Sequence, residues 1–95
     1  MNRDELIERL KMRLDLWNAE INRIENTAQV TQAEAQEEFR KQIEQLCARR
    51  DAASSQLEEL RQAGGEAWKD LQTGVEEALA ALGEAVDRAR ARFTH

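Results

Sequence analysis

The chain has 95 residues, enough for one small domain, which we place at residues 1–95. It contains no proline and no tyrosine, only 4% aromatic residues and 35% charged residues, so its composition excludes β-rich and α/β folds and predicts an all-α fold. The formal net charge of −5 argues against a nucleic-acid-binding protein, because that class needs a basic surface that displaces counterions.

Three features of the sequence bear on the location of the protein. The single cysteine, Cys47, cannot form an internal disulfide, so an oxidising compartment is not indicated. Residues 1–10 are charged and lack the apolar segment of a secretory signal. No run approaches the roughly 18 apolar residues that a membrane-spanning helix needs. These features indicate neither a secreted nor a membrane-spanning protein.

The first expected helix extends from about residue 3 to about residue 62. Neither glycine nor proline occurs before Gly64, and apolar residues recur in steps of four and three. Asn2 and Glu5 have the spacing of a capping box, which places the start of this helix at residue 2 or 3. Gly64 is suited to end it in the left-handed conformation that favours glycine.

The pair Gly64-Gly65 predicts a tight turn into a second helix at about residues 66–93, antiparallel to the first. The two helices then form a long antiparallel helical hairpin. The second helix contains Gly83, for which the pattern gives no reason. It also carries a row of small residues that predicts a close neighbour along this edge: Gly74, Ala78, Ala81 and Ala85.

The hairpin leaves the N-terminal half of the first helix without a neighbour, because the second helix ends opposite Ala35. Residues 6–28 carry seven large apolar side chains on one face, and leaving them in water would forgo about 1.5–3 kcal/mol each. We therefore expect a coiled-coil or helix-bundle homodimer, in which two continuous helices cross near residue 34. The residues expected at this self-association interface are Leu10, Leu14, Trp17, Ile21, Ile24, Ile43, Leu46 and Leu57.

A monomeric three-helix bundle, broken near residues 26–31, would bury almost the same side chains. Thr31 and Glu34 have the spacing of a capping box that could start the additional helix. The β-branched residues in this segment also favour a break, because they form helix less readily. We nevertheless favour the continuous helix, because residues 25–35 contain neither glycine nor proline.

Residues capable of chemistry do not form a catalytic or metal-binding pattern. The one histidine, His95, is the last residue, where chains are usually frayed, and Cys47 is expected to be a structural thiol at the edge of the apolar stripe. Carboxylates and cations alternate at helical spacing, which is typical of a solvated surface. We expect no enzyme, no metal site and no cofactor. The basic cluster near the C-terminus suits the negative end of the last helix: Arg88, Arg90 and Arg92.

Two segments around the tryptophans, WNAEI at residues 17–21 and AWKDL at residues 67–71, stand out together with QEEFRKQIEQL at residues 36–46. With these segments the chain resembles a family of small bacterial coiled-coil proteins that are loosely described as stress-responsive. The resemblance implies a cytoplasmic helical protein connected with stress, and it implies no catalytic residues.

These observations predict a non-enzymatic structural or protein-interaction coiled-coil protein that self-associates. Its first expected partner is a second copy, bound through the N-terminal half of the first helix, and another protein is a further candidate. The alternative is a peripheral protein whose amphipathic helices lie on a lipid surface. We favour it less because the helix faces mix both charges with an acidic excess, whereas membrane-surface helices carry mainly Lys and Arg.

Overall fold

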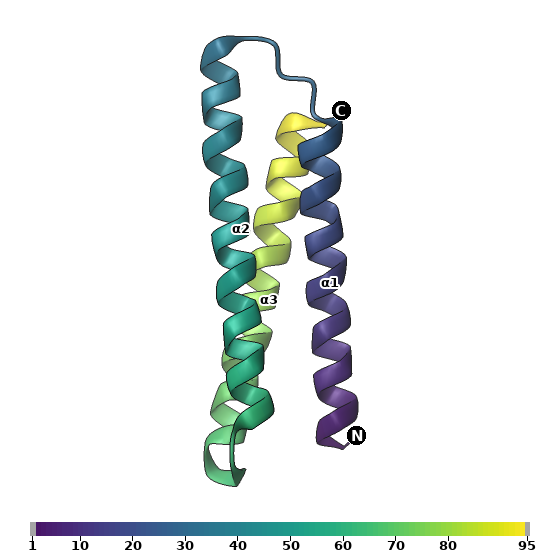
Figure 1. Ribbon diagram of the computed structural model, residues 1–95, viewed down its shortest axis with the longest axis vertical. Coiled ribbons are helices and arrows are strands. Elements are labelled where there is room, and N and C mark those ends of the chain that lie inside the picture. The colour runs from purple at the N-terminus through teal and green to yellow at the C-terminus, as the bar shows by residue number, and fades with distance from the viewer. Residues whose placement is uncertain (1, 95) are drawn as a thin grey trace.

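The computed structural model describes residues 2–94, which form three α-helices packed into one bundle. These are α1 (Arg3–Thr27), α2 (Ala33–Gln62) and α3 (Gly65–Phe93). As Figure 1 shows, α1 and α3 run in the same direction and α2 runs antiparallel to both. Each helix contacts the other two, and the Cα trace measures 51 × 18 × 15 Å. The expected all-α fold is confirmed, and no strand occurs within residues 2–94.

The continuous helix expected over residues 3–62 is wrong, because the chain leaves helical geometry at residues 28–32. Ala28 has φ −65° and ψ 130°, and Gln32 has φ −82° and ψ 137°, so the backbone is extended at both ends of this connector. The connector lets α1 turn back along α2 (Figure 1). The arrangement is therefore that of the three-helix alternative.

Local chemistry accounts for the position of this break. The segment contains Thr27, Val30 and Thr31, whose β-branched side chains lower helix propensity. The Gln36 side-chain amide donates a 2.9 Å hydrogen bond to the Val30 carbonyl, which has left the helix. Folding back also buries the apolar stripe of α1 within one chain, where the effective concentration of the two surfaces is high.

The helix starts agree with the sequence in one case and differ in the other. The Asn2 side-chain oxygen accepts a 2.8 Å hydrogen bond from the Glu5 amide, which confirms the expected cap of α1. The cap expected from Thr31 and Glu34 is wrong, because α2 begins after Gln32, whose side chain makes no capping hydrogen bond.

The turn between α2 and α3 lies where the glycine pair predicts it, but its backbone differs from the expectation. Gly64 has φ −82° and ψ 174°, so it is extended and not left-handed. The helix end is instead closed by the Ala63 amide, which donates to the Leu60 carbonyl at 3.2 Å. An extended turn of this length still brings α3 directly back along α2.

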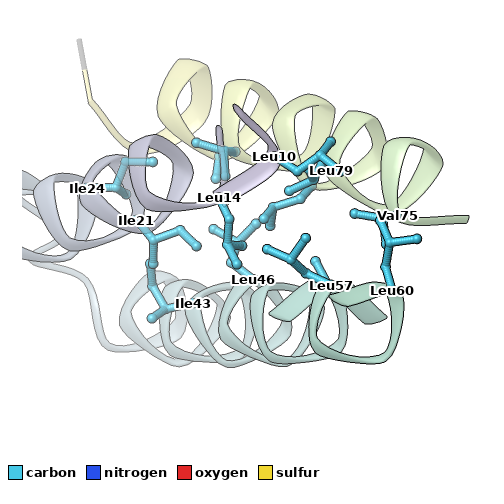
Figure 2. Packing of buried hydrophobic residues seen from close by; sticks show 14 residues of the cluster. Leu10, Leu14, Ile21, Ile24, Ile43, Leu46, Leu57, Leu60, Val75 and Leu79 are labelled. Carbon is cyan, nitrogen blue, oxygen red and sulfur yellow. The ribbon is translucent and has the colours of Figure 1, made fainter. Parts of the chain in front are cut away.

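The core is one cluster of apolar side chains drawn from all three helices (Figure 2). Its members recur at helical spacing, so each helix directs one apolar stripe toward the bundle axis. At the end near the connector, Phe39 of α2 and Phe93 of α3 pack edge to face with ring centroids 4.9 Å apart. The fully buried side chains with the largest volumes are Leu10, Ile21, Ile24, Leu60, Val75, Leu79, Leu82 and Val86.

Candidate functional site

The residues expected at the self-association interface lie in the core of a single chain. Figure 2 shows the labelled α1 members among the core side chains of α2 and α3. Trp17 is only partly buried and packs against the rim of the core. The neighbour that the N-terminal stripe requires is thus supplied by the same chain. The buried members of this set are Leu10, Leu14, Ile21, Ile24, Ile43, Leu46 and Leu57.

Trp17 crosses from α1 to the backbone of α3 at Gly83. An ideal Cβ on Gly83 would lie 2.6 Å from Cζ2 and 2.9 Å from Cε2 of the Trp17 indole. Real Cβ atoms are not found this close to other heavy atoms, so only glycine fits here without movement of the indole. This contact explains the glycine that the sequence pattern leaves unexplained.

Beside this contact lies a groove between α1 and α3, which we call the α1–α3 groove. Leu16 at its edge is 66% exposed, and Met12, one turn earlier on α1, is 62% exposed. These two are the large apolar side chains that residues 2–94 leave most open to solvent. The residues that line the groove are Arg13, Leu16, Trp17, Leu79, Ala80, Gly83, Glu84 and Asp87.

The two banks of the α1–α3 groove carry opposite charges. Arg13 lies on the α1 bank, and Glu84 and Asp87 lie on the α3 bank. Asp87 is paired with Arg90 of its own helix at 2.6 Å. Within the described chain, neither Arg13 nor Glu84 forms an ion pair, although both are exposed.

A polar contact joins α1 and α2 at the edge of the core. Arg50 interrupts the apolar stripe of α2, and its Nη1 donates a 2.9 Å hydrogen bond to Oδ1 of Asn18 on α1. The same guanidinium pairs with Asp51 at 3.0 Å. A polar residue within an apolar stripe specifies which neighbour and which register a helix accepts. The hydrogen bond between Arg50 and Asn18 favours the register in which α1 and α2 pack here.

The arginines near the C-terminus connect helices. Arg90 of α3 lies 3.5 Å from Glu20 of α1, and Arg92 of α3 pairs with Glu38 of α2. These contacts hold α3 to both neighbours at the connector end of the bundle. Exposed pairs of this kind each contribute little to stability.

The other candidate residues form no reactive cluster. Cys47 is a free thiol that is half-buried against the apolar core. His95 lies outside the residues that the structure describes. Among residues 2–94, no group of three or more His, Cys, Asp or Glu side chains is placed to hold a metal ion.

The row of small residues on α3 does not behave as expected at Gly74. An ideal Cβ on this residue would have no other heavy atom within 4 Å. The close neighbour expected there is therefore wrong. Close approach of a helix occurs at Gly83, on the α1 side of α3.

Comparison with known proteins provides no relative from which a function could be carried over. No protein-family model matches the chain, and neither a curated protein nor a solved structure matches it. Within residues 2–94, no helix has the length and apolarity required to cross a membrane.

Sequence reasoning missed the α1–α3 groove and the partner of Arg50. Leu16 and Met12 lie outside the apolar stripe, and an isolated exposed apolar residue is common on protein surfaces. The signals present were an arginine within the apolar stripe and Gly83 within a helix. Neither signal identifies its partner, because Asn18 and Trp17 lie on another helix.

Proposed function

We propose that this chain is a non-enzymatic protein-interaction protein that forms a homodimer by exchanging α1 between two copies. In the exchanged form, residues 28–32 become helical, so α1 runs directly into α2 as one continuous helix. The α1 of each chain then packs on α2 and α3 of the other. The expected interface residues are retained, with a second chain supplying their neighbours.

The observation that supports this proposal is the geometry of the connector. Ala28 and Gln32 already have φ values of −65° and −82°, so each differs from an α-helix mainly in ψ. The connector contains neither glycine nor proline. At both ends of the connector, a rotation about ψ therefore suffices to restore helical geometry, while the side chains of the core keep contacts of the same kind.

The resemblance described above implies that such an assembly would act in the cytoplasm, in connection with stress. The closed monomer and the exchanged dimer bury the same core side chains. More frequent unfolding would therefore let the protein pass from one form to the other. Heating is one condition that does so, because α1 must leave the core before it can exchange.

The experiment compares substitutions that change the connector alone. Val30→Ala with Thr31→Ala raises helix propensity by about 0.5 kcal/mol per residue, or about 2 kcal/mol over two chains, which is about 30-fold in the dimer dissociation constant. Insertion of Gly-Gly-Ser-Gly after Gln29 should have the opposite effect, because it disfavours a helical connector. Solution mass is measured by light scattering after refolding at low and high protein concentration.

Thr73→Ala is the matched control, because Thr73 is an exposed β-branched residue within α3. This substitution stabilises the closed and exchanged forms equally, so the dimer fraction should stay unchanged. The proposal is wrong if the alanine variant and the insertion variant refold with the same mass at every concentration. Co-sedimentation of the alanine variant with lipid vesicles, without formation of a dimer, would favour the membrane-surface alternative.

A further inference from the structure

We propose that the α1–α3 groove is a docking surface for a second copy of the intact bundle. This contact is separate from the exchange of α1, because it leaves residues 28–32 in their extended conformation. The surface combines the exposed side chains of Leu16 and Met12 with the charged banks of the groove. Its occupant follows from the arrangement of those charges.

The groove carries both halves of a complementary pair. Arg13 stands on the α1 bank and Glu84 on the α3 bank of the same groove. Neither forms an ion pair within residues 2–94. A partner that matches this surface must present an acid opposite Arg13 and a base opposite Glu84, and a second copy presents both.

The charges decide how the copies meet. Whereas a perpendicular twofold axis would place α1 on α1 and set like charges against each other, a twofold axis parallel to the bundle places α1 of one copy on α3 of the other. Arg13 of each copy then faces Glu84 of the other. Leu16 of each copy enters the opposite groove over Ala80. The contact is reciprocal, so it closes as a dimer and does not extend into a filament.

The size of the surface sets the strength of the complex. Two large exposed apolar side chains per copy are fewer than a standard interface of about 800 Å² per partner contains. We therefore expect a weak, rapidly exchanging dimer with a dissociation constant on the order of 0.1 mM. Such a complex dissociates rapidly on dilution, whereas an exchanged dimer dissociates slowly because α1 must first leave the core.

The first test follows amide chemical shifts and weight-average mass between about 10 µM and about 1 mM, a range that spans the expected dissociation constant. Concentration-dependent shifts should concentrate at the residues that line the groove. Leu16→Asp should raise the dissociation constant at least about tenfold, because it places a charge in the apolar contact. Ala52→Asp, at an exposed position of α2, adds the same charge away from the groove and should leave pairing unchanged.

The second test uses charge exchange between copies. Arg13→Glu alone and Glu84→Arg alone should each lose pairing, because like charges then face each other across the interface. An equimolar mixture of the two variants should restore it, since every facing pair is again of opposite sign. A mixture of Arg49→Glu with Glu59→Arg carries the same net charges on exposed positions of α2 and should not gain pairing.

The proposal is overturned if shifts and mass are independent of concentration, or if the Arg13 and Glu84 variants do not rescue each other. Equal pairing in the control mixture would also overturn it, because net charge alone would then explain the result. A dimer that persists on dilution, with shifts at residues 28–32, would indicate exchange of α1. That outcome rejects docking through the groove and leaves the proposed function in place.

Discussion

The indole of Trp17 on α1 occupies the space that a side chain at position 83 of α3 would need, with 2.6 Å between its Cζ2 atom and an ideal Cβ on Gly83. Glycine within a helix costs about 1 kcal/mol relative to alanine. At position 83 this cost is offset by close packing of Trp17 against the α3 backbone. The pair thus sets the separation of α1 and α3 near the middle of the bundle.

Gly83→Ala should therefore destabilise the protein by about 1 kcal/mol, because overpacking costs about 1–3 kcal/mol and improved helix propensity returns only about 1 kcal/mol. Urea denaturation followed by circular dichroism measures this change. In a Trp17→Ala background, the same substitution should become stabilising, since the obstacle has been removed. Stabilisation by Gly83→Ala in the otherwise unchanged protein would contradict the account of this contact.

Gly74→Ala is the companion substitution on the same helix. Its new methyl group meets no heavy atom within 4 Å, so only helix propensity changes. We expect stabilisation of about 1 kcal/mol in the same denaturation experiment. A loss of stability would mean that the α2 side of α3 is packed more closely than the structure indicates.

The apolar spacing was sufficient to predict the helical residues outside the connector, the turn near Gly64 and most of the core. It was not sufficient to place the connector, because the continuous and the broken helix bury almost the same side chains. The choice rests on local terms at residues 28–32 and on the advantage of closing within one chain. Neither term alters the pattern of apolar residues from which the hairpin was predicted.

The partners of Arg50 and Gly83 were harder to predict, for a geometric reason. Arg50 was visible as an interruption of an apolar stripe, and Gly83 as a glycine inside a helix. Their partners, Asn18 and Trp17, lie on α1 and become neighbours only after α1 folds back. An incorrect path for α1 therefore hides both relationships.

The contact between Asn18 and Arg50 should appear as a coupling energy. Asn18→Ala removes the acceptor of the 2.9 Å hydrogen bond and should destabilise the protein by about 1 kcal/mol. In an Arg50→Leu background the same substitution should cost less, because there is no guanidinium left to lose its hydrogen-bond acceptor. A double-mutant cycle by chemical denaturation measures the difference, and a coupling energy near zero would show that the two side chains act independently.

The pair formed by Glu37 and Arg40 should be detectable by titration. A hydrogen bond from Arg40, together with its charge, lowers the pKa of Glu37 below its ordinary value of 4.5. Because the folded pKa is lowered, the pair contributes stability above the unfolded pKa and loses it as the pH falls through the folded pKa. The contribution is small because both side chains are exposed.

Arg40→Gln should return the pKa of Glu37 toward its ordinary value, which carboxyl carbon shifts in an NMR titration would show. Arg61→Gln is the control, because Arg61 pairs with Glu58 elsewhere on α2. An unchanged Glu37 pKa after the Arg40 substitution would mean that this ion pair does not persist in solution.

The most direct test of the central claim, that α1 folds back on α2 within one chain, is a distance between the two ends that this fold brings together. Arg3 of α1 lies over the Trp68 ring of α3, 4.9 Å from its centroid. Spin labels are attached at Glu5→Cys and Glu66→Cys in a Cys47→Ala background. Pulsed electron–electron double resonance then measures the distance between the two labels. Dilution with unlabelled chain ensures that only pairs within one chain contribute. The closed bundle predicts a separation set by its 18 Å width and the label arms. A separation of roughly 85 Å at a protein concentration low enough for the chain to be monomeric, the length of an unbroken helix over this span, would contradict it.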